Sequence, residues 1–178
     1  MDVALKTESE DDWPWLWHWR HEVSNPDWKQ WDSPFLHEHM ERLTFDQFRH
    51  QQTLNPRTRA IIVVNGQRVG TVHRNELPPY GGGWWDFGIA IYDPEHRKQG
   101  AGYTASTLWI DHTFKHTDAH VITLSTWSGN EQMINLGTKL GFTECSRIPQ
   151  ARLWRGSRYD VVQMSLLRSD WFPLSARR

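Results

Sequence analysis

Residues 93–103, DPEHRKQGAGY, decide how this chain folds. They follow an apolar run at residues 84–92, WWDFGIAIY, which predicts a buried strand, and they precede a helical pattern at residues 102–116. Gly100 and Gly102 stand where that helix begins, and a glycine lets backbone N–H groups approach an anion closely. Because a helix N-terminus adds unpaired N–H donors and a partial positive charge, the stretch predicts a pyrophosphate-binding loop.

Two cations, Arg97 and Lys98, precede the glycines and reinforce this prediction. The alternative is an ordinary glycine-rich turn with charged side chains on the surface.

Two other phosphate-binding motifs fit less well. A P-loop needs Lys followed by Ser or Thr after its last glycine, and the chain continues from Gly102 without them. The glycine spacing matches a dinucleotide-binding fold, but seven residues separate the first glycine from the strand, and no acid ends the run at residues 121–127.

The length and composition exclude several classes of protein. A chain of 178 residues predicts a single domain spanning residues 1–178. A net charge of -1 argues against binding nucleic acid through a broad basic field. The single Cys145 excludes an internal disulfide and a cysteine-rich zinc site, and it fits a reducing compartment. With no apolar run of about 20 residues and an acidic N-terminus unlike a signal peptide, we expect a cytoplasmic protein that binds neither nucleic acid nor membrane.

Hydrophobic patterning along the rest of the chain predicts one α/β domain with a mixed central sheet of about seven strands flanked by about four helices. Asn65-Gly66 lies between two runs that read as strands and predicts a hairpin turn. Residues 24–34 hold two prolines, and we expect a loop there. The predicted strands cover residues 2–7, 59–64, 67–73, 84–92, 121–127, 142–153 and 159–167. The predicted helices begin near Trp13 and at residues 44, 102 and 131, and the second ends before Asn55-Pro56.

Three segments carry a family resemblance. Arg97-x-x-Gly100-x-Gly102 resembles the R/Q-x-x-G-x-G/A pyrophosphate motif of the GNAT superfamily of acetyl-CoA-dependent N-acetyltransferases. Asn130 followed by Lys139-Leu-Gly-Phe resembles the N…KLGF segment of the same family. The ending GSRYD and LLRSDW, at residues 156–160 and 166–171, is similar to the RimJ/RimL-type branch, named for ribosomal-protein acetylation. The resemblance covers roughly residues 3–171 and implies a GNAT-like domain that uses acetyl-CoA.

The resemblance also implies a binding site for acetyl-CoA. In such proteins pantetheine lies beside the strand before the phosphate loop, which carries over here to Ala90, Ile91 and Tyr92. Asn130 would contact the pantetheine arm, although it could equally cap the helix from Glu131, and both can hold. The pyrophosphate would lie on the backbone N–H groups of Arg97, Lys98, Gln99, Gly100, Ala101, Gly102 and Tyr103.

The histidines at positions 112, 116 and 120 lack an acid to complete a metal site, so no metal is expected.

The implied reaction is attack of a neutral amine on a thioester, which needs a base to take the amine proton. We expect Asp86 to be this base, because it precedes Arg97 by the spacing of a strand glutamate that the histone-acetylating branch uses. A structural carboxylate paired with Arg or Lys is the alternative, and Glu76 is the reserve candidate. Many family members place a Tyr general acid where this chain has Gly137. Water or Tyr159 could serve instead.

The 12 tryptophans are far more than usual and must pack a core or line a site. We expect Trp28, Trp31, Trp84 and Trp85 to wall an acceptor pocket, with apolar area or a cation–π face for an ammonium group. The leading interpretation is an N-acetyltransferase, monomeric or homodimeric, acting on a protein N-terminal α-amine or a small amine. A CoA-binding module without catalysis and a protein-interaction domain with a tryptophan surface remain as alternatives.

Overall fold

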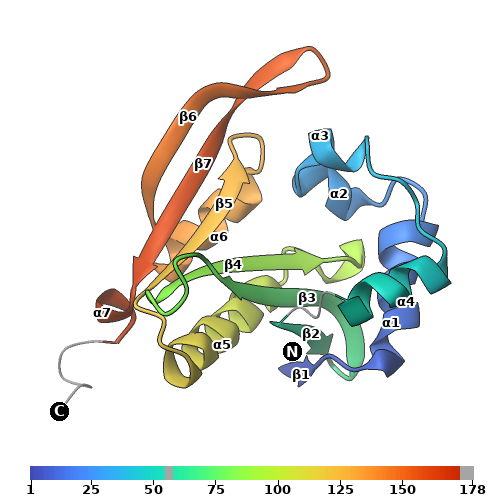
Figure 1. Ribbon diagram of the computed structural model, residues 1–178, viewed down its shortest axis with the longest axis horizontal. Helices are drawn as coiled ribbons and strands as arrows, with labels where there is room; N and C mark the ends of the chain where they lie inside the picture. Colours follow the sequence, from blue (N-terminus) through green and yellow to red (C-terminus); the bar gives the residue numbers. More distant parts are fainter. Residues whose placement is uncertain (55–57, 173–178) are drawn as a thin grey trace.

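The computed structural model describes residues 1–54 and 58–172, and these form one α/β domain around a seven-stranded sheet (Figure 1). The strand order is β1-β2-β3-β4-β5-β7-β6. The predicted mixed sheet, its seven strands and the order of elements are confirmed. The strands are β1 (Val3–Thr7), β2 (Thr58–Val64), β3 (Gln67–Glu76), β4 (Trp84–Ile91), β5 (Val121–Trp127), β6 (Thr143–Trp154) and β7 (Ser157–Leu167). The described residues do not include 55–57 and 173–178. The predicted helix stop at Asn55-Pro56 and the end of the predicted domain therefore lie outside them.

The sheet consists of two antiparallel parts joined by one parallel pair. Strands β1 to β4 pair antiparallel in chain order, and β5, β7 and β6 pair antiparallel as well. Strands β4 and β5 are parallel, and helix α5 (Ala101–His116) connects them. The predicted hairpin turn is confirmed, because Asn65 and Gly66 join β2 to β3 with φ of 48° and 82°, the left-handed values that this turn requires.

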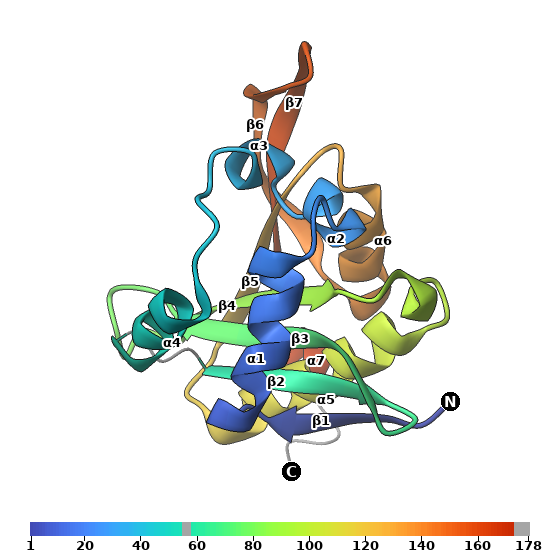
Figure 2. The same cartoon turned by 90° about the vertical axis from the view of Figure 1, so that its right-hand side faces the viewer.

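Two hydrophobic clusters cover the two faces of the sheet. Helices α5 and α6 (Glu131–Leu140) pack on one face in the larger cluster, which includes Ile110 and Phe87. Helices α1 (Trp13–Trp17) and α4 (Phe45–Leu54) pack on the other face around Leu16 and Tyr92. Figure 2 shows α1 crossing in front of β2, β3 and β4, with α5 behind them. Alternate residues of β4 therefore contribute to different clusters, as a strand buried on both faces requires.

The segment before β2 differs from the prediction. Residues 24–34 were expected to be a loop, but they contain α2 (Asp27–Trp31) and the start of α3 (Pro34–His37). Each helix begins at a proline, with Pro26 at the N-cap of α2 and Pro34 as the first residue of α3, where a missing N–H costs nothing. The first predicted helix is confirmed at Trp13 and continues as a π-helix over His18–Glu22. A last short helix, α7 (Arg168–Trp171), follows β7, and no described helix is long and apolar enough to cross a membrane.

Candidate active site

The parallel pair at the centre of the sheet separates soon after it forms. Strand β4 pairs with β5 only from Trp84 to Asp86, opposite Val121 to Thr123. Beyond that point β4 runs towards α1 and α2, while β5 rises with β7 towards the β6–β7 hairpin (Figure 1). A cavity of about 690 Å³ occupies the angle between them. Its walls come from β4, the end of β5, α6, the loop before α5, and α2.

The loop before α5 has the geometry expected of an anion-binding loop. Gly100 has φ of 90°, which favours glycine, and it stands at the N-cap of α5. A Cβ on Gly102 would meet nothing nearer than Ile89 Cδ1 at 3.8 Å, so the cavity side of this residue is open. Gly100, Gly102 and Lys98 all line the cavity. The loop thus presents a helix N-terminus and an accessible backbone to one end of the cavity.

The Arg97 side chain has a different role from the one its position suggests. Its guanidinium donates to the Ile91 carbonyl oxygen from Nε at 3.1 Å and Nη2 at 2.8 Å, and it forms an ion pair with Asp27. Within the described part of the chain, Lys98 makes no ion pair or hydrogen bond through its side chain, and it keeps its charge available to a ligand. Arg97 therefore joins the loop to the end of β4 and to α2.

The other residues predicted to contact the cosubstrate divide into two groups. Ala90, Ile91, Tyr92, Tyr103 and Asn130 line the cavity. Asn130 also caps α6, because its Oδ1 accepts a hydrogen bond of 3.1 Å from the Met133 N–H. The side chains of Gln99 and Ala101 do not line it: Gln99 donates to the Glu95 carbonyl oxygen at 2.7 Å, and Ala101 is buried in the larger cluster. These two could contact a ligand only through their backbone.

Asp86 lies where β4 and β5 separate, and its side chain lines the cavity. Burial raises the pKa of Asp86 to about 6, although hydrogen bonds with the Phe87 backbone and the Asn75 side chain act in the opposite direction. A carboxylate of this kind is ionised at neutral pH and is a stronger base than an exposed aspartate.

Sequence reasoning missed His73, which also lines the cavity. It lies on β3 opposite Gly88, two pairs beyond the Asn75–Asp86 pair and therefore on the same face of the sheet. A Cβ on Gly88 would lie 2.1 Å from His73 Cε1, so the imidazole covers this glycine. A glycine inside an apolar strand signals close approach of another group, and Gly88 was that signal.

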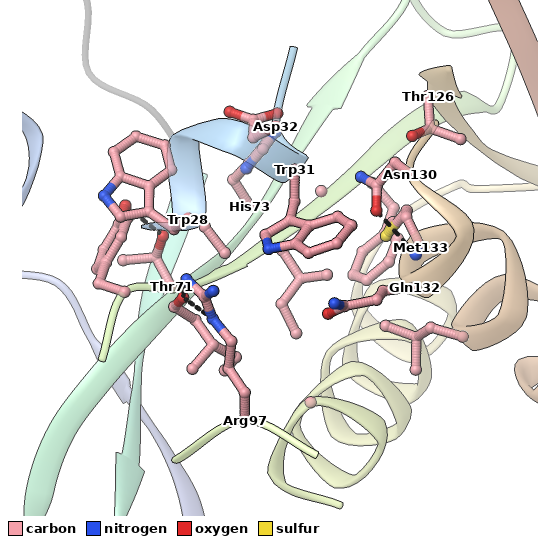
Figure 3. A pocket seen from close by; sticks show the side chains of 18 of the residues that line it. Trp28, Trp31, Asp32, Thr71, His73, Arg97, Thr126, Asn130, Gln132 and Met133 are labelled. Carbon is pink, nitrogen blue, oxygen red and sulfur yellow. Dashed lines mark hydrogen bonds between the residues drawn. The ribbon is translucent and has the colours of Figure 1, made fainter. Parts of the chain in front are cut away.

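Helix α2 brings two of the four predicted acceptor-site tryptophans to the cavity. Trp28 is buried with its ring 5.1 Å from that of Tyr92. Figure 3 shows the Trp31 indole in the middle of the cavity, between Arg97 on one side and Asn130 on the other. The Trp31 carbonyl oxygen accepts a 2.9 Å hydrogen bond from Trp127 Nε1 at the end of β5, which holds α2 across the opening.

The other two tryptophans, Trp84 and Trp85, do not line the cavity. Their indole N–H groups donate to Thr123 Oγ1 and Asp118 Oδ1, each at 2.9 Å. These bonds stabilise the start of β4 against β5 and the segment that precedes it. Both residues therefore help to build the sheet rather than the cavity wall.

Comparison with known proteins identifies the family. The family model described as "Acetyltransferase (GNAT) domain" matches residues 3–143. The chain belongs to the GNAT acetyltransferase family. No curated protein sequence matches it significantly.

Several solved structures share the GNAT fold of this chain. Spermidine N-acetyltransferase from Vibrio cholerae, in complex with CoA and spermine, is 20% identical, with 95% of this chain and 97% of that chain covered and a TM-score of 0.77. Ribosomal-protein-alanine N-acetyltransferase from Brucella melitensis is 19% identical, covering 92% and 99%, with a TM-score of 0.68. RimL, a ribosomal L7/L12 α-N-protein acetyltransferase in complex with coenzyme A, is 16% identical, covering 96% and 96%, with a TM-score of 0.74.

The cosubstrate of GNAT enzymes is acetyl-CoA, and the cavity has groups that fit it. The open Gly102 backbone and the N-terminus of α5 suit a pyrophosphate, and Lys98 adds a cation. The edge of β4 beyond Asp86 is not paired with β5, so its peptide groups can bond an amide-bearing arm such as pantetheine. Among the described residues, no group of three or more His, Cys, Asp or Glu side chains could hold a metal ion.

Neither Gly137, which stands where many family members have a Tyr general acid, nor the candidate Tyr159 supplies a hydroxyl to the cavity. A Cβ on Gly137 would lie 3.0 Å from Met164 Sδ and 3.1 Å from Leu124 Cδ2, so a tyrosine there would displace the core. Tyr159 packs against Trp127 at 4.8 Å between ring centroids, away from the cavity lining.

Glu76, the reserve base, lies at the end of β3 and also does not line the cavity. Its carboxylate accepts a hydrogen bond from the Gly81 N–H and supports the loop before β4. The GNAT site thus retains Asp86 as the carboxylate at the point where the strands separate, with His73 beside it.

Proposed function

We propose that this protein transfers the acetyl group of acetyl-CoA to a primary amine, with Asp86 as the base. The observation that carries the proposal is the position of Asp86 at the point where β4 leaves β5, in the same cavity as the α5 N-terminus. A cosubstrate with its phosphates on the loop and its arm along β4 has its reactive end near this carboxylate.

In the proposed reaction, the protein's own side chains move protons to and from the reacting groups. An α-amine with a pKa of about 7.7–8.0 or a lysine-type amine of about 10.4 arrives mostly protonated at neutral pH, and attack requires the neutral form. Asp86, ionised above pH of about 6, takes the proton from the nitrogen. Acetyl-CoA supplies a thioester carbonyl: the C–N bond forms, the C–S bond breaks, and the thiol leaves. We assign His73 as the donor of the proton that the thiolate takes up, since it lies beside Asp86 on the same face.

The charges around the cavity favour an acceptor with one amine. The described lining contains two carboxylates, Asp32 and Asp86, and Asp32 already bonds to His37 Nε2 at 3.0 Å. The cationic lining residues are Arg20, Arg59, Arg97, Lys98 and Lys139. A polyamine with three or four charges would find few partners here, whereas a single α-amine needs one. This supports the protein N-terminal α-amine that the RimJ/RimL-like ending suggests.

Binding and turnover are tested separately. Isothermal titration with acetyl-CoA measures cosubstrate binding, and release of free thiol is then followed with spermidine, amino acids and peptides with free N-termini. Acetyl-CoA binding with thiol release on peptides supports the proposal. Binding without release on any amine favours a CoA-binding module without catalysis, and absence of binding favours an interaction domain that uses its tryptophans.

A further inference from the structure

The β6–β7 hairpin extends past the body of the sheet as a two-stranded arm. Strand β5 pairs with β7 only as far as Trp127 opposite Val161, so the hairpin beyond that pair has no third strand. Figure 1 shows the arm rising past β5, with its tip above the level of α3. The turn at the tip uses Arg155 and Gly156, with φ of 48° and 77°.

The tip of this arm carries a concentration of positive charge. Arg152, Arg155 and Arg158 form no ion pair with any described residue, whereas Arg147 lower on the arm is paired with carboxylates on both strands. Arg155 lies over the Trp154 ring at 4.5 Å, which holds its guanidinium in place while leaving its charge uncompensated. In a chain of net charge -1, three unpaired arginines within seven residues are a local feature that predicts an acidic partner.

The arm contacts α3, whose first residue comes directly after Trp31, Asp32 and Ser33 in the wall of the cavity. Trp154 Nε1 donates to Glu38 Oε1 at 2.9 Å, and Arg152 lies over the Phe35 ring at 5.2 Å. The arm, α3 and the segment just after α3 expose large apolar side chains, each more than half accessible: Leu36, Met40, Ile148 and Leu153. Arginine, methionine and tryptophan are the residue types enriched where proteins meet. The surface therefore suits a polypeptide that carries both acidic and apolar residues.

We propose that the arm tip and α3 form a docking surface for the acceptor polypeptide, which binds through an acidic stretch downstream of its N-terminal amine. This inference rests on the proposed function and extends it, because it makes the acceptor a polypeptide with a defined charge pattern.

The strand register sets the position of that acidic stretch. Asp86 pairs with Thr123, and Thr123 pairs with Ser165 on β7, so Ser165 marks the level of the base. Arg158 lies seven residues and Arg155 ten residues from Ser165, which is roughly 23 and 33 Å of strand at about 3.3 Å per residue. An extended acceptor also covers about 3.3–3.6 Å per residue. Acidic side chains at about positions 7–10 of the acceptor would therefore reach the arm.

The test uses three 14-residue peptides with the same first five residues. One has Asp or Glu at positions 7–10, one has Asn or Gln there, and one moves the acids to positions 11–14. Thiol release gives kcat and KM for each peptide with wild type, with Arg155→Gln/Arg158→Gln, and with Arg49→Gln/Lys115→Gln. The last variant is a matched control, because it removes two exposed charges from α4 and α5.

We expect the first peptide to have the lowest KM with wild type. An exposed ion pair changes affinity about two- to fivefold, so the arm variant should raise that KM by about tenfold without changing kcat, and the control should not. Equal KM values for the three peptides, or the same loss in the control, would overturn the docking surface. If small amines are acetylated but no peptide is, the docking surface is overturned while acetyl transfer stands. If no amine of any kind is acetylated, the proposed function is refuted as well. Dimerisation of wild type that the arm variant abolishes would assign the surface to a second copy.

Discussion

Replacing Asp86 with Asn tests the assignment of the base, because Asn keeps the shape of the side chain and removes the proton acceptor. We expect kcat for a peptide amine to fall about 10²–10⁴-fold at pH 7, the usual range for one acid–base group, which corresponds to about 3–5 kcal/mol of barrier. Acetyl-CoA binding by titration should stay close to wild type, since Asp86 lies on β4, outside the phosphate loop at residues 97–103. Continuous thiol release measures the turnover.

The pH dependence follows from the raised pKa of Asp86. Only the ionised carboxylate accepts a proton, so wild-type kcat should fall as pH drops through about 6. The Asn variant should lack this step. Its deficit should shrink above pH of about 8, because an α-amine is then already neutral.

The raised pKa of Asp86 also predicts that the folded state becomes less stable as pH rises. Because the folded state binds the Asp86 proton more tightly than the unfolded chain, with a pKa of about 6 against 3.8, the ionised carboxylate opposes folding. Wild type should lose up to about 3 kcal/mol from this group as pH rises from about 4 to above 6, and Asp86→Asn should not. Urea unfolding followed by circular dichroism at pH 4 and pH 8, the two ends of this range, gives both free energies. Wild-type turnover in the variant at neutral pH would refute the base, and a variant less stable than wild type at pH 8 would show that the carboxylate is structural.

Four further substitutions test the cavity. Gly102→Val should fold normally by circular dichroism, since only Ile89 lies within 4 Å of the new Cβ, yet raise the Kd for acetyl-CoA; unchanged binding would contradict the phosphate loop. Lys98→Ala should flatten the salt dependence of acetyl-CoA binding, while Arg97→Ala should leave the slope near wild type because its guanidinium is already bonded; equal flattening by both would show that Arg97 reaches the phosphates. His73→Gln should lower kcat by about 10²-fold with little change in KM, and an unchanged kcat would pass the proton to water.

The fold could be predicted because its signals are local. The Asn65-Gly66 turn, the strand before residue 93 and the glycines at the start of α5 each depend on near neighbours. Their order along the chain is enough to define an α/β domain with one parallel pair. Helices α2 and α3 could not be predicted in the same way, because they are only five and four residues long. Such short helices depend on tertiary contacts, such as the Trp127–Trp31 bond, more than on propensity.

The site could be predicted only in part, because a motif gives the position of a residue but not the direction of its side chain. Arg97 stands at the expected place in the loop, yet its guanidinium turns back to Ile91 and Asp27. Trp84 and Trp85 neighbour Asp86 in the chain, but neither lines the cavity. The alternation along β4 places Trp85 on the opposite face from Asp86, and the indole of Trp84 bonds to Thr123 on β5. Apart from Ile91, which is six residues from Arg97, the partners in these hydrogen bonds lie 33 to 70 residues away in the chain.

The separation of β4 from β5 explains both the position of the proposed base, Asp86, and the free edge of β4 that could bind pantetheine. If β4 stayed paired with β5 to its end, its peptide groups would be satisfied within the sheet and no edge would remain for pantetheine. If the strands separated one pair earlier, Asp86 would lose its pairing with Thr123 and with it part of the burial that raises its pKa. Separation after Asp86 therefore leaves a partly buried carboxylate next to Phe87, the first β4 residue that does not pair with β5. This juxtaposition is set by strand register, so a register change at this pair should impair binding and proton transfer together.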